Sequence, residues 1–318
     1  MYQLDAKDKK ILAILSVDAR ATYAEIGKKT RLHKDTVAYR IKKLEEEGII
    51  TGYTAFFDFS RLNTRVYKLY VKFRGLKEGE RQRLLLFLKR EKHVGWIAEG
   101  NGSWDTIIGF HTSSVKEFYD FKLSFEQEFH KKIQSINETT QIQAYLFPRD
   151  YLVFSSREEV ILYSSSPSAV IDSKDRAILQ GLAKNSRASV IDIARTTRLS
   201  VRTVSYRIKQ LEKQNIILQY RCSLNLSKIQ RIFIKAFISL SNIDKKKKEE
   251  ILNFFKEQPC VVHNVESLGE WELEPEFEVE NIEEFYNIIN EFRSRFAEHI
   301  EKIDSMMVSR EYKYQYVP

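Results

Sequence analysis

The chain has 318 residues, of which 43% are hydrophobic and 30% are charged, and its formal net charge is +8. Because this length exceeds what one hydrophobic core fills, we expect several domains of ordinary size. The two cysteines, Cys222 and Cys260, are too few for a disulfide framework and lack the spacing of a zinc or redox site. The polar N-terminus and the lack of a long apolar run predict neither a signal peptide nor a membrane span, so we expect a cytoplasmic protein.

An internal repeat organises the sequence. An offset of 167 residues aligns residues 4–62 with residues 171–229 without a gap, and 24 of the 59 aligned positions are identical. The densest match is the run Thr-Val-x-Tyr-Arg-Ile-Lys, which occupies Thr36–Lys42 and recurs at Thr203–Lys209. Because the same offset persists more faintly through the rest of each half, we infer that whole halves are duplicated.

Each half begins with three predicted helices. Asp5 precedes an apolar helical stripe and is the expected N-cap of the first helix. Thr22–Glu25 has the pattern of a capping box and predicts the start of a second helix. The corresponding residues of the second copy are Ser189–Asp192. After a short turn, the apolar spacing predicts a third helix over Lys34–Glu47, followed by a β-branched and aromatic strand or wing. This order indicates a winged helix-turn-helix.

The outer face of the third helix carries polar and basic side chains once its apolar stripe is turned inward. Such side chains suit the base edges and phosphates of a DNA major groove. The second copy has Ser200 as its helix cap, where the first copy has the weaker cap His33. The residues that we expect to contact DNA are Lys34, Asp35, Thr36, Tyr39, Arg40, Lys42 and Lys43 in the first copy, and Ser200, Arg202, Thr203, Tyr206, Arg207, Lys209, Gln210 and Lys213 in the second.

Positive charge is concentrated in these modules. Residues 171–229 hold 12 Lys and Arg against 4 Asp and Glu, whereas residues 4–62 hold 12 against 9. Because the two net charges, +8 and +3, together exceed the +8 of the whole chain, the remainder is acidic. Binding to a phosphate backbone uses such an excess, and we expect the second copy to supply more of the affinity. The alternative for this pattern alone is a plain three-helix bundle without a nucleic-acid role.

The second part of each half alternates strands and helices in the order β-α-β-β-α-β, which is typical of a ferredoxin-like domain. In the first copy the pattern predicts strands at Val66–Phe73, Val94–Ala98, Thr106–Phe110 and Thr140–Phe147, and helices at Glu80–Lys89 and Val115–Phe129.

We therefore expect an α+β chain in which two winged helix-turn-helix domains alternate with two ferredoxin-like βαββαβ domains. The helix-turn-helix domains are residues 1–62 and 171–229, and the ferredoxin-like domains are residues 65–153 and 232–318. Residues 154–170 form the expected linker, in which an apolar stretch near residues 160–163 predicts an added strand.

Three stretches carry a resemblance to a known family. They are the run Thr36–Glu45, the following Gly48–Tyr53, and the hairpin Gly102-Ser103-Trp104-Asp105. On these residues the chain resembles a tandem fusion of two Lrp/AsnC-family (feast/famine) regulators over nearly its whole length. The resemblance implies a winged helix-turn-helix that binds DNA and a companion (RAM) domain that pairs about a two-fold axis and binds a small effector, often an amino acid.

The resemblance also implies effector-binding residues at the hairpins of the companion domains. These are Gly100, Gly102 and Asp105 in the first copy, and Gly269 and Glu272 in the second, which has Glu where the family pattern has Asp. We expect the two companion domains to pair within the chain, which would present two unlike recognition helices to an asymmetric operator. A homo-oligomer is a further expectation.

The expected partner is double-stranded DNA, with no membrane association. The sequence predicts no catalytic residue, no cofactor and no metal site, because its six histidines lack ligand spacing. Two alternatives stay open. Siroheme decarboxylases resemble the same two-domain layout, and His263 is the residue that favours this enzymatic alternative. The other alternative is an architectural DNA-binding protein of low sequence specificity.

Overall fold

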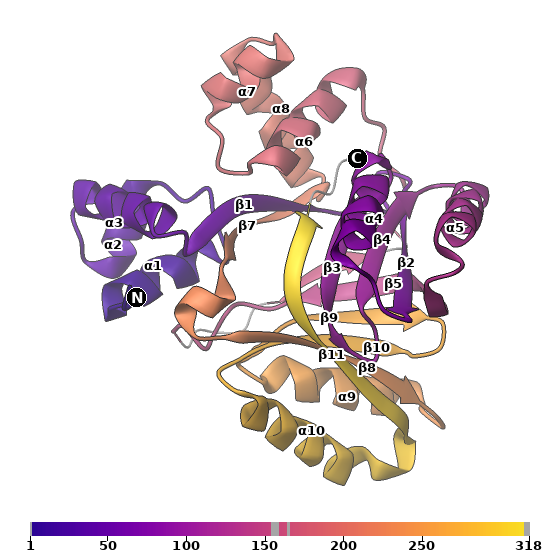
Figure 1. Cartoon of the computed structure of the whole chain (residues 1–318). Helices are drawn as coiled ribbons and strands as arrows, with labels where there is room; N and C mark the ends of the chain where they lie inside the picture. The colour runs from indigo at the N-terminus through magenta and orange to yellow at the C-terminus, as the bar shows by residue number, and fades with distance from the viewer. Residues whose placement is uncertain (1, 154–158, 164–165, 315–318) are drawn as a thin grey trace.

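The computed structural model describes residues 2–153, 159–163 and 166–314. The first helix-turn-helix is followed along the chain by the strands and helices of the first ferredoxin-like unit (Figure 1). The elements of this first half are α1 (Ala6–Leu15), α2 (Tyr23–Thr30), α3 (Lys34–Glu46), β1 (Ile50–Phe57), β2 (Arg65–Phe73), α4 (Glu78–Arg90), β3 (Val94–Gly102), β4 (Thr106–Thr112), α5 (Val115–Phe129), β5 (Ile133–Leu146) and β6 (Val160–Tyr163).

The second half repeats this order. Its elements are α6 (Ser173–Lys184), α7 (Val190–Thr197), α8 (Val201–Lys213), β7 (Ile217–Leu224), η1 (Leu226–Ile229), β8 (Ile232–Leu240), α9 (Lys245–Glu257), β9 (Val261–Leu268), β10 (Leu273–Val279), α10 (Ile282–Phe296), η2 (Ala297–His299) and β11 (Ile300–Tyr314). The strand expected within the linker is confirmed as β6, which pairs with the end of β5. Residues 154–158 and 164–165 of the expected linker lie outside the described residues.

Most helices begin where the sequence places their caps. The capping boxes predicted at Asp5 and Thr22 are both present. Ser189 caps α7 through the backbone N–H three residues on. Ser200 caps α8 in the same way, whereas His33 makes no side-chain cap hydrogen bond at α3. The predicted difference in cap strength between the two third helices is thus confirmed.

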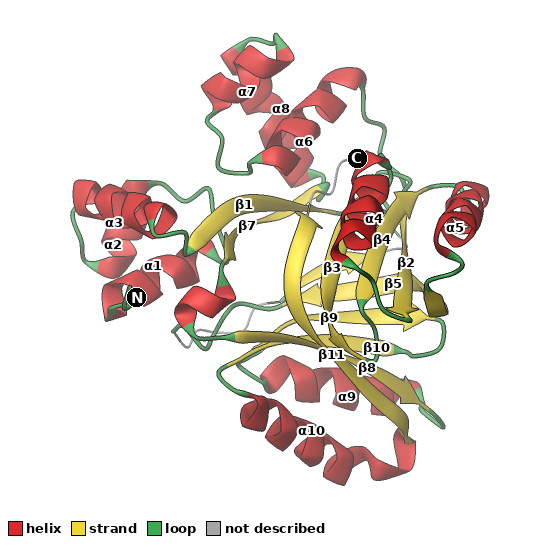
Figure 2. Cartoon of the chain, viewed as in Figure 1, coloured by secondary structure: helices red, strands yellow, loops and turns green. Residues whose placement is uncertain are grey.

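The two ferredoxin-like units merge their sheets into one closed barrel. The strand order is β2-β4-β3-β11-β8-β10-β9-β5, and a β2–β5 pairing closes the circle. Strands of different copies meet at two seams, where β3 pairs with β11 and β5 pairs with β9. Helices α4 and α5 cover the barrel on the side of the first copy, and α9 and α10 cover it on the side of the second (Figure 2).

An aromatic cluster inside the barrel joins the two copies. Tyr70, Trp96 and Trp104 of the first copy pack there with Phe237 and Trp271 of the second. The rings of Tyr70 and Trp271 meet edge to face with their centroids 4.7 Å apart. All three tryptophans of the chain therefore belong to this shared core.

Strands β1 and β7, which follow the two helix-turn-helix units, pair antiparallel with each other. They form a two-stranded ribbon that runs between the units (Figure 1). The strand expected after the third helix is therefore present, but it is half of a shared ribbon. Its partner strand comes from the other copy, a long-range pairing that local pattern does not encode.

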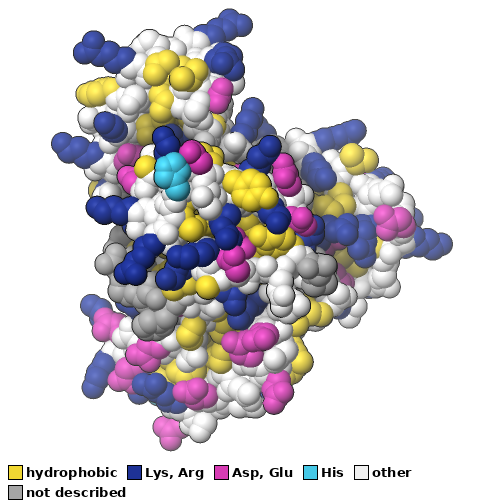
Figure 3. Space-filling view, turned by 90° about the vertical axis from the view of Figure 1, so that its left-hand side faces the viewer, with side chains coloured by type: hydrophobic (Ala, Val, Ile, Leu, Met, Phe, Trp, Pro, Cys, Tyr) yellow, Lys and Arg dark blue, Asp and Glu magenta, His cyan; other side chains and the backbone are white. Residues whose placement is uncertain are grey.

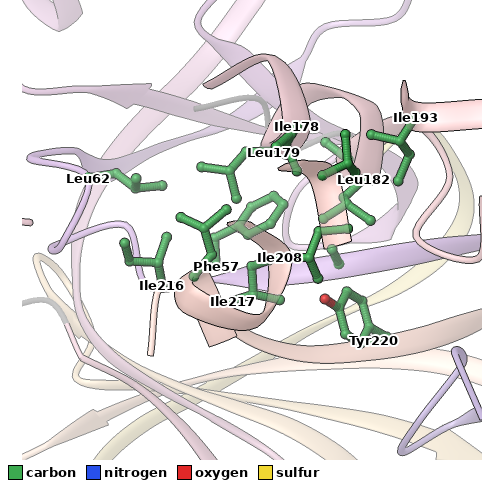
Figure 4. Packing of buried hydrophobic residues seen from close by; sticks show 14 of the residues in the cluster. Phe57, Leu62, Ile178, Leu179, Leu182, Ile193, Ile208, Ile216, Ile217 and Tyr220 are labelled. Atoms are coloured by element: carbon green, nitrogen blue, oxygen red, sulfur yellow. The ribbon is translucent and has the colours of Figure 1, made fainter. Parts of the chain in front are cut away.

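The ribbon also exchanges core residues between the copies. Phe57 and Leu62 of the first copy pack in one cluster with Leu179 and Ile208 of the second (Figure 4). Conversely, the buried Cys222 of β7 packs among the helices of the first unit. A fully buried side chain as large as Phe57 contributes about 2–3 kcal/mol of burial free energy. Each helix-turn-helix thus has a core that the other copy completes.

Candidate nucleic-acid interface

The outer faces of α3 and α8 are open to solvent, as the helical wheel predicts. Tyr39 and Tyr206 occupy equivalent positions on these faces, and their side chains are 64% and 63% exposed. The other outward residues with exposed side chains are Lys34, Asp35, Thr36 and Lys42 on α3, and Arg202, Lys209 and Lys213 on α8, with the cap residue Ser200. Lys43, Thr203 and Gln210 are half-buried. Apart from Arg40 and Arg207, the expected DNA-contacting residues thus line two similar surfaces.

Two arginines expected to contact DNA are held instead inside their own units. The Nη1 atom of Arg40 lies 2.7 Å from a carboxylate oxygen of Asp5 and 2.8 Å from one of Asp8. Arg207 makes the same pair of contacts with Asp172 and Asp175, at 2.9 and 2.8 Å.

These clamps tie each third helix to the start of the first helix. Hydrogen bonds from the Asp8 backbone and from the guanidinium of Arg40 lower the pKa of Asp5, and the corresponding donors lower the pKa of Asp172. Because Nη1 of each arginine is paired with two carboxylates of its own unit, we leave Arg40 and Arg207 out of the proposed DNA-contacting set.

The first recognition face carries acidic groups that partly neutralise it. The Oδ2 atom of Asp35 lies 3.3 Å from Nδ1 of His33, and Glu46 lies 3.5 Å from Nζ of Lys42. The corresponding positions of the second copy are Arg202 and Lys213. Figure 3 shows Lys and Arg side chains projecting from the upper and middle parts of one face, with Asp and Glu more numerous toward its lower end. The positive potential offered to a phosphate backbone is therefore stronger at α8.

A reciprocal pair of arginines locks the two units together. Arg20 donates from Nη1 to the backbone oxygens of Ser186 and Ala188 in the second copy, at 2.6 and 3.0 Å. Arg187 donates in the same way to the backbone oxygens of Ala19 and Ala21 in the first copy. Sequence reasoning gave these two residues no role, although the repeat pairs them as identical residues. The lock ties the segment between α1 and α2 to the segment between α6 and α7.

The three glycines expected to bind an effector lie at the seams of the barrel. Gly100 and Gly102 lie against β11, where an added Cβ would come within 2.1 Å of the Met307 oxygen and 2.3 Å of the Ser305 oxygen, respectively. Gly269 lies close to β5, where an added Cβ would meet the Glu138 oxygen at 2.8 Å. These glycines allow strands of different copies to approach.

The acidic members of the expected effector set are hydrogen-bonded within the chain. Asp105 accepts from Nζ of Lys72 at 2.7 Å and from the backbone N–H of Phe73 at 2.8 Å. Glu272 accepts from the backbone N–H of Leu240 at 2.7 Å. An effector role for this set stays a prediction, whereas its structural role in the hairpins is visible.

A large cavity lies between the ribbon and the barrel. Its volume is about 1100 Å³, and its walls come from β1 and β7 on one side and from barrel strands on the other. His263 lines it, with Nδ1 3.0 Å from Oε2 of Glu276, whose Oε1 lies 2.6 Å from Nζ of the buried Lys235. Burial lowers the pKa of His263, which favours the neutral form of the ring.

The described residues contain neither a candidate membrane-spanning helix nor a candidate metal-binding cluster. No helix in them combines the length and apolar content that crossing a bilayer requires. Nor does this part of the chain bring together three or more His, Cys, Asp or Glu in a group that could hold a metal ion.

Comparison with known proteins gives the class of the fold and then the family. An AsnC-type helix-turn-helix domain matches residues 4–45, and a winged helix-turn-helix DNA-binding domain matches residues 171–217. An uncharacterized HTH-type transcriptional regulator of Pyrococcus furiosus is 35% identical over 107 residues, which cover 33% of this chain and 70% of that protein. The regulator LrpA of Pyrococcus horikoshii is 38% identical over 118 residues, which cover 33% of this chain and 83% of LrpA. The chain belongs to the Lrp/AsnC family of HTH-type transcriptional regulators.

The whole two-copy fold is also similar to a solved structure. The siroheme decarboxylase NirDL matches 98% of this chain and 94% of its own, with a TM-score of 0.62 and 12% sequence identity. At this identity the likeness is one of fold.

Proposed function

We propose that the protein regulates transcription in the cytoplasm by reading an asymmetric double-stranded DNA site through α3 and α8. The observation that carries this proposal is the pair of exposed, unlike faces on two units that Arg20 and Arg187 hydrogen-bond to each other. Two recognition helices held within one chain require two DNA half-sites at a fixed spacing. Because the two faces differ in charge, the half-sites differ too.

The DNA-contacting set that we propose consists of the outward side chains of the two helices. They are Lys34, Asp35, Thr36, Tyr39, Lys42 and Lys43 in the first copy, and Ser200, Arg202, Thr203, Tyr206, Lys209, Gln210 and Lys213 in the second. Modulation by a small effector, as the family resemblance implies, belongs to the same proposal.

Binding-site selection with the purified full chain at a stated salt concentration tests this function. We expect an asymmetric motif and affinity that falls steeply as salt rises. The variant R202A/K209A should lose at least about tenfold in affinity, because each residue offers a phosphate or base contact. The control K245A/K246A removes the same charge from exposed positions on α9 and should bind as the wild type does. Equal binding to specific and random duplexes would favour an architectural protein instead.

A second candidate function is a siroheme decarboxylase-like enzyme. The observation that favours it is the cavity lined by His263, whose ring is held by Glu276. Incubation with a tetrapyrrole, followed by visible spectroscopy and product analysis, separates the two functions. A spectral shift with release of CO₂ and without salt-sensitive DNA binding would replace the regulator with the enzyme.

A further inference from the structure

The cavity between the ribbon and the barrel has the properties of a ligand site. Its volume of about 1100 Å³ is at the upper end of what pockets for drug-sized ligands provide, roughly 300–1000 Å³. None of the five residues expected to bind an effector lines it. It is therefore a separate place from the hairpins to which the family resemblance points.

The charges around the cavity favour an anion. Seven Lys and Arg residues line it, against three Glu and no Asp. Three of these cations are ion-paired: Lys68 with Glu274 at 2.6 Å, Arg149 with Glu278 at 2.7 Å and Arg231 with Glu284 at 3.6 Å. Within the described part of the chain, no ion pair involves the rim residues Lys89, Lys184 and Arg310. The rim therefore presents positive charge to an entering ligand.

The polar wall offers one acceptor without a partner among the described residues. Because Nδ1 of His263 faces the Glu276 carboxylate, that nitrogen carries the proton of the neutral ring. Its Nε2 atom is buried and has no hydrogen-bond partner in the described residues. A ligand that places an N–H or O–H group at Nε2 would satisfy this acceptor.

The remaining walls supply apolar surface and a link to the recognition helices. Trp96 and Phe233 line the cavity from the barrel side. Tyr53 of β1 lines it from the ribbon side, and its hydroxyl donates to Oε1 of Glu45 on α3 at 2.5 Å. A ligand that touches both walls therefore touches an element that positions a recognition helix.

We propose that this cavity binds an organic anion larger than an amino acid, with a hydrogen-bond donor for His263, and that its occupancy changes DNA affinity through the β1–β7 ribbon. The anion is a carboxylate or a phosphate ester, since both suit Lys and Arg. The coupling part rests on the proposed DNA-binding function, and the ligand part does not.

Calorimetric titration of the full chain tests the ligand part. The probes are citrate, AMP, uroporphyrin III and L-leucine, each measured separately, so that small carboxylates, phosphate esters, large polycarboxylates and free amino acids are distinguished. We expect at least one of the three organic anions to bind and leucine not to bind at this site. If no anion binds at concentrations up to about 1 mM, the weak-affinity limit for such a ligand, the inference is overturned.

Variants locate the binding. K89A/R310A removes rim charge at exposed positions, and H263F removes the Nε2 acceptor while keeping an aromatic ring. Both variants should weaken anion binding at least about tenfold. The control K245A/K246A should leave binding unchanged, and unchanged melting temperatures show that the variants are folded. If K89A/R310A and H263F bind the anion as the wild type does, the anion lies elsewhere and the inference is overturned.

DNA titration with and without the bound anion tests the coupling. We expect the dissociation constant for the selected duplex to change by about fivefold or more, as is common for coupled sites, and this response to be lost in H263F. An anion that binds without changing DNA affinity overturns the coupling while the proposed function stands. A protein that binds the anion but no DNA overturns the proposed function while the ligand site stands.

Discussion

The two helix-turn-helix units share the contacts that hold them together and differ in the surface that they expose. Both have the Arg–Asp clamp between the first and third helices, through Arg40 in one unit and Arg207 in the other. Both contribute one arginine to the reciprocal lock. The outward positions Asp35 and Glu46, in contrast, correspond to Arg202 and Lys213.

This difference separates the residues that stabilise each helix-turn-helix unit from the exposed residues that we propose to contact DNA. A clamp that holds two helices must stay the same for both copies to fold. An exposed face is free of that constraint, so its divergence points to two different DNA half-sites. The comparison gives four predictions.

The largest effect is expected from giving the second face the charges of the first. R202D/K213E should weaken binding to the selected duplex about 10- to 100-fold near 0.1 M salt, because two phosphate-facing cations become anions. The slope of log Kd against log salt should fall by about 2. Fluorescence anisotropy over a salt series measures both quantities. K245E/K246E on α9 makes the same change of net charge away from the faces, and an equal loss there would contradict the assignment.

The converse exchange should strengthen the first face. D35R/E46K removes the acidic partners of His33 and Lys42 and adds two cations, so affinity should rise about 3- to 10-fold. Repeating site selection with this variant shows whether the motif becomes more symmetric. Unchanged affinity and motif would mean that α3 does not contact DNA.

Breaking the lock should affect spacing more than affinity. R20A and R187A each remove hydrogen bonds from a charged donor to backbone oxygens, which should lower the free energy of unfolding by about 1–3 kcal/mol. Moving the half-sites of the duplex apart or together by one or two base pairs should then reduce the affinity of the variants less than it reduces that of the wild type. Denaturant unfolding and a spacing series measure the two effects. If the variants kept a spacing preference as sharp as that of the wild type, the ribbon alone would set the distance between α3 and α8.

The smallest effect concerns the helix caps. H33S gives α3 the cap that Ser200 gives α8, and it should stabilise the chain by about 0.5–1 kcal/mol. S200A should destabilise by about the same amount or slightly more. Urea denaturation of both variants provides the comparison. If H33S gave no gain while S200A caused a loss, the first unit would already be limited by something other than its cap.

Local patterns predicted the helices well because caps and apolar spacing act over a few residues. The predicted helix at Val115–Phe129 is α5 at the same residues, and α3 ends one residue before the predicted end. Strand β5 begins at Ile133, seven residues before the predicted start. Its first part is mostly polar and contains a single buried residue, Thr139, so alternation gave no signal, and it is a strand because it pairs with β2.

The site was predicted in part for the same reason. The helical wheel placed Tyr39 and Tyr206 on exposed faces, but it could not show that the guanidinium groups of Arg40 and Arg207 turn back toward the first helix of each unit. The cavity joins residues from strands far apart along the chain, so no local spacing marked it.

The exchange of core residues through the ribbon has a consequence for dividing this protein. A cut between the two copies would give two fragments, each with half of the closed barrel. Each fragment would also lack the strand from the other copy that completes its own helix-turn-helix core. Neither fragment could bury its own apolar surface alone, so we expect the two fragments to recover structure and activity when they are mixed. The duplicated gene product therefore resembles an obligate heterodimer whose subunits are covalently tethered.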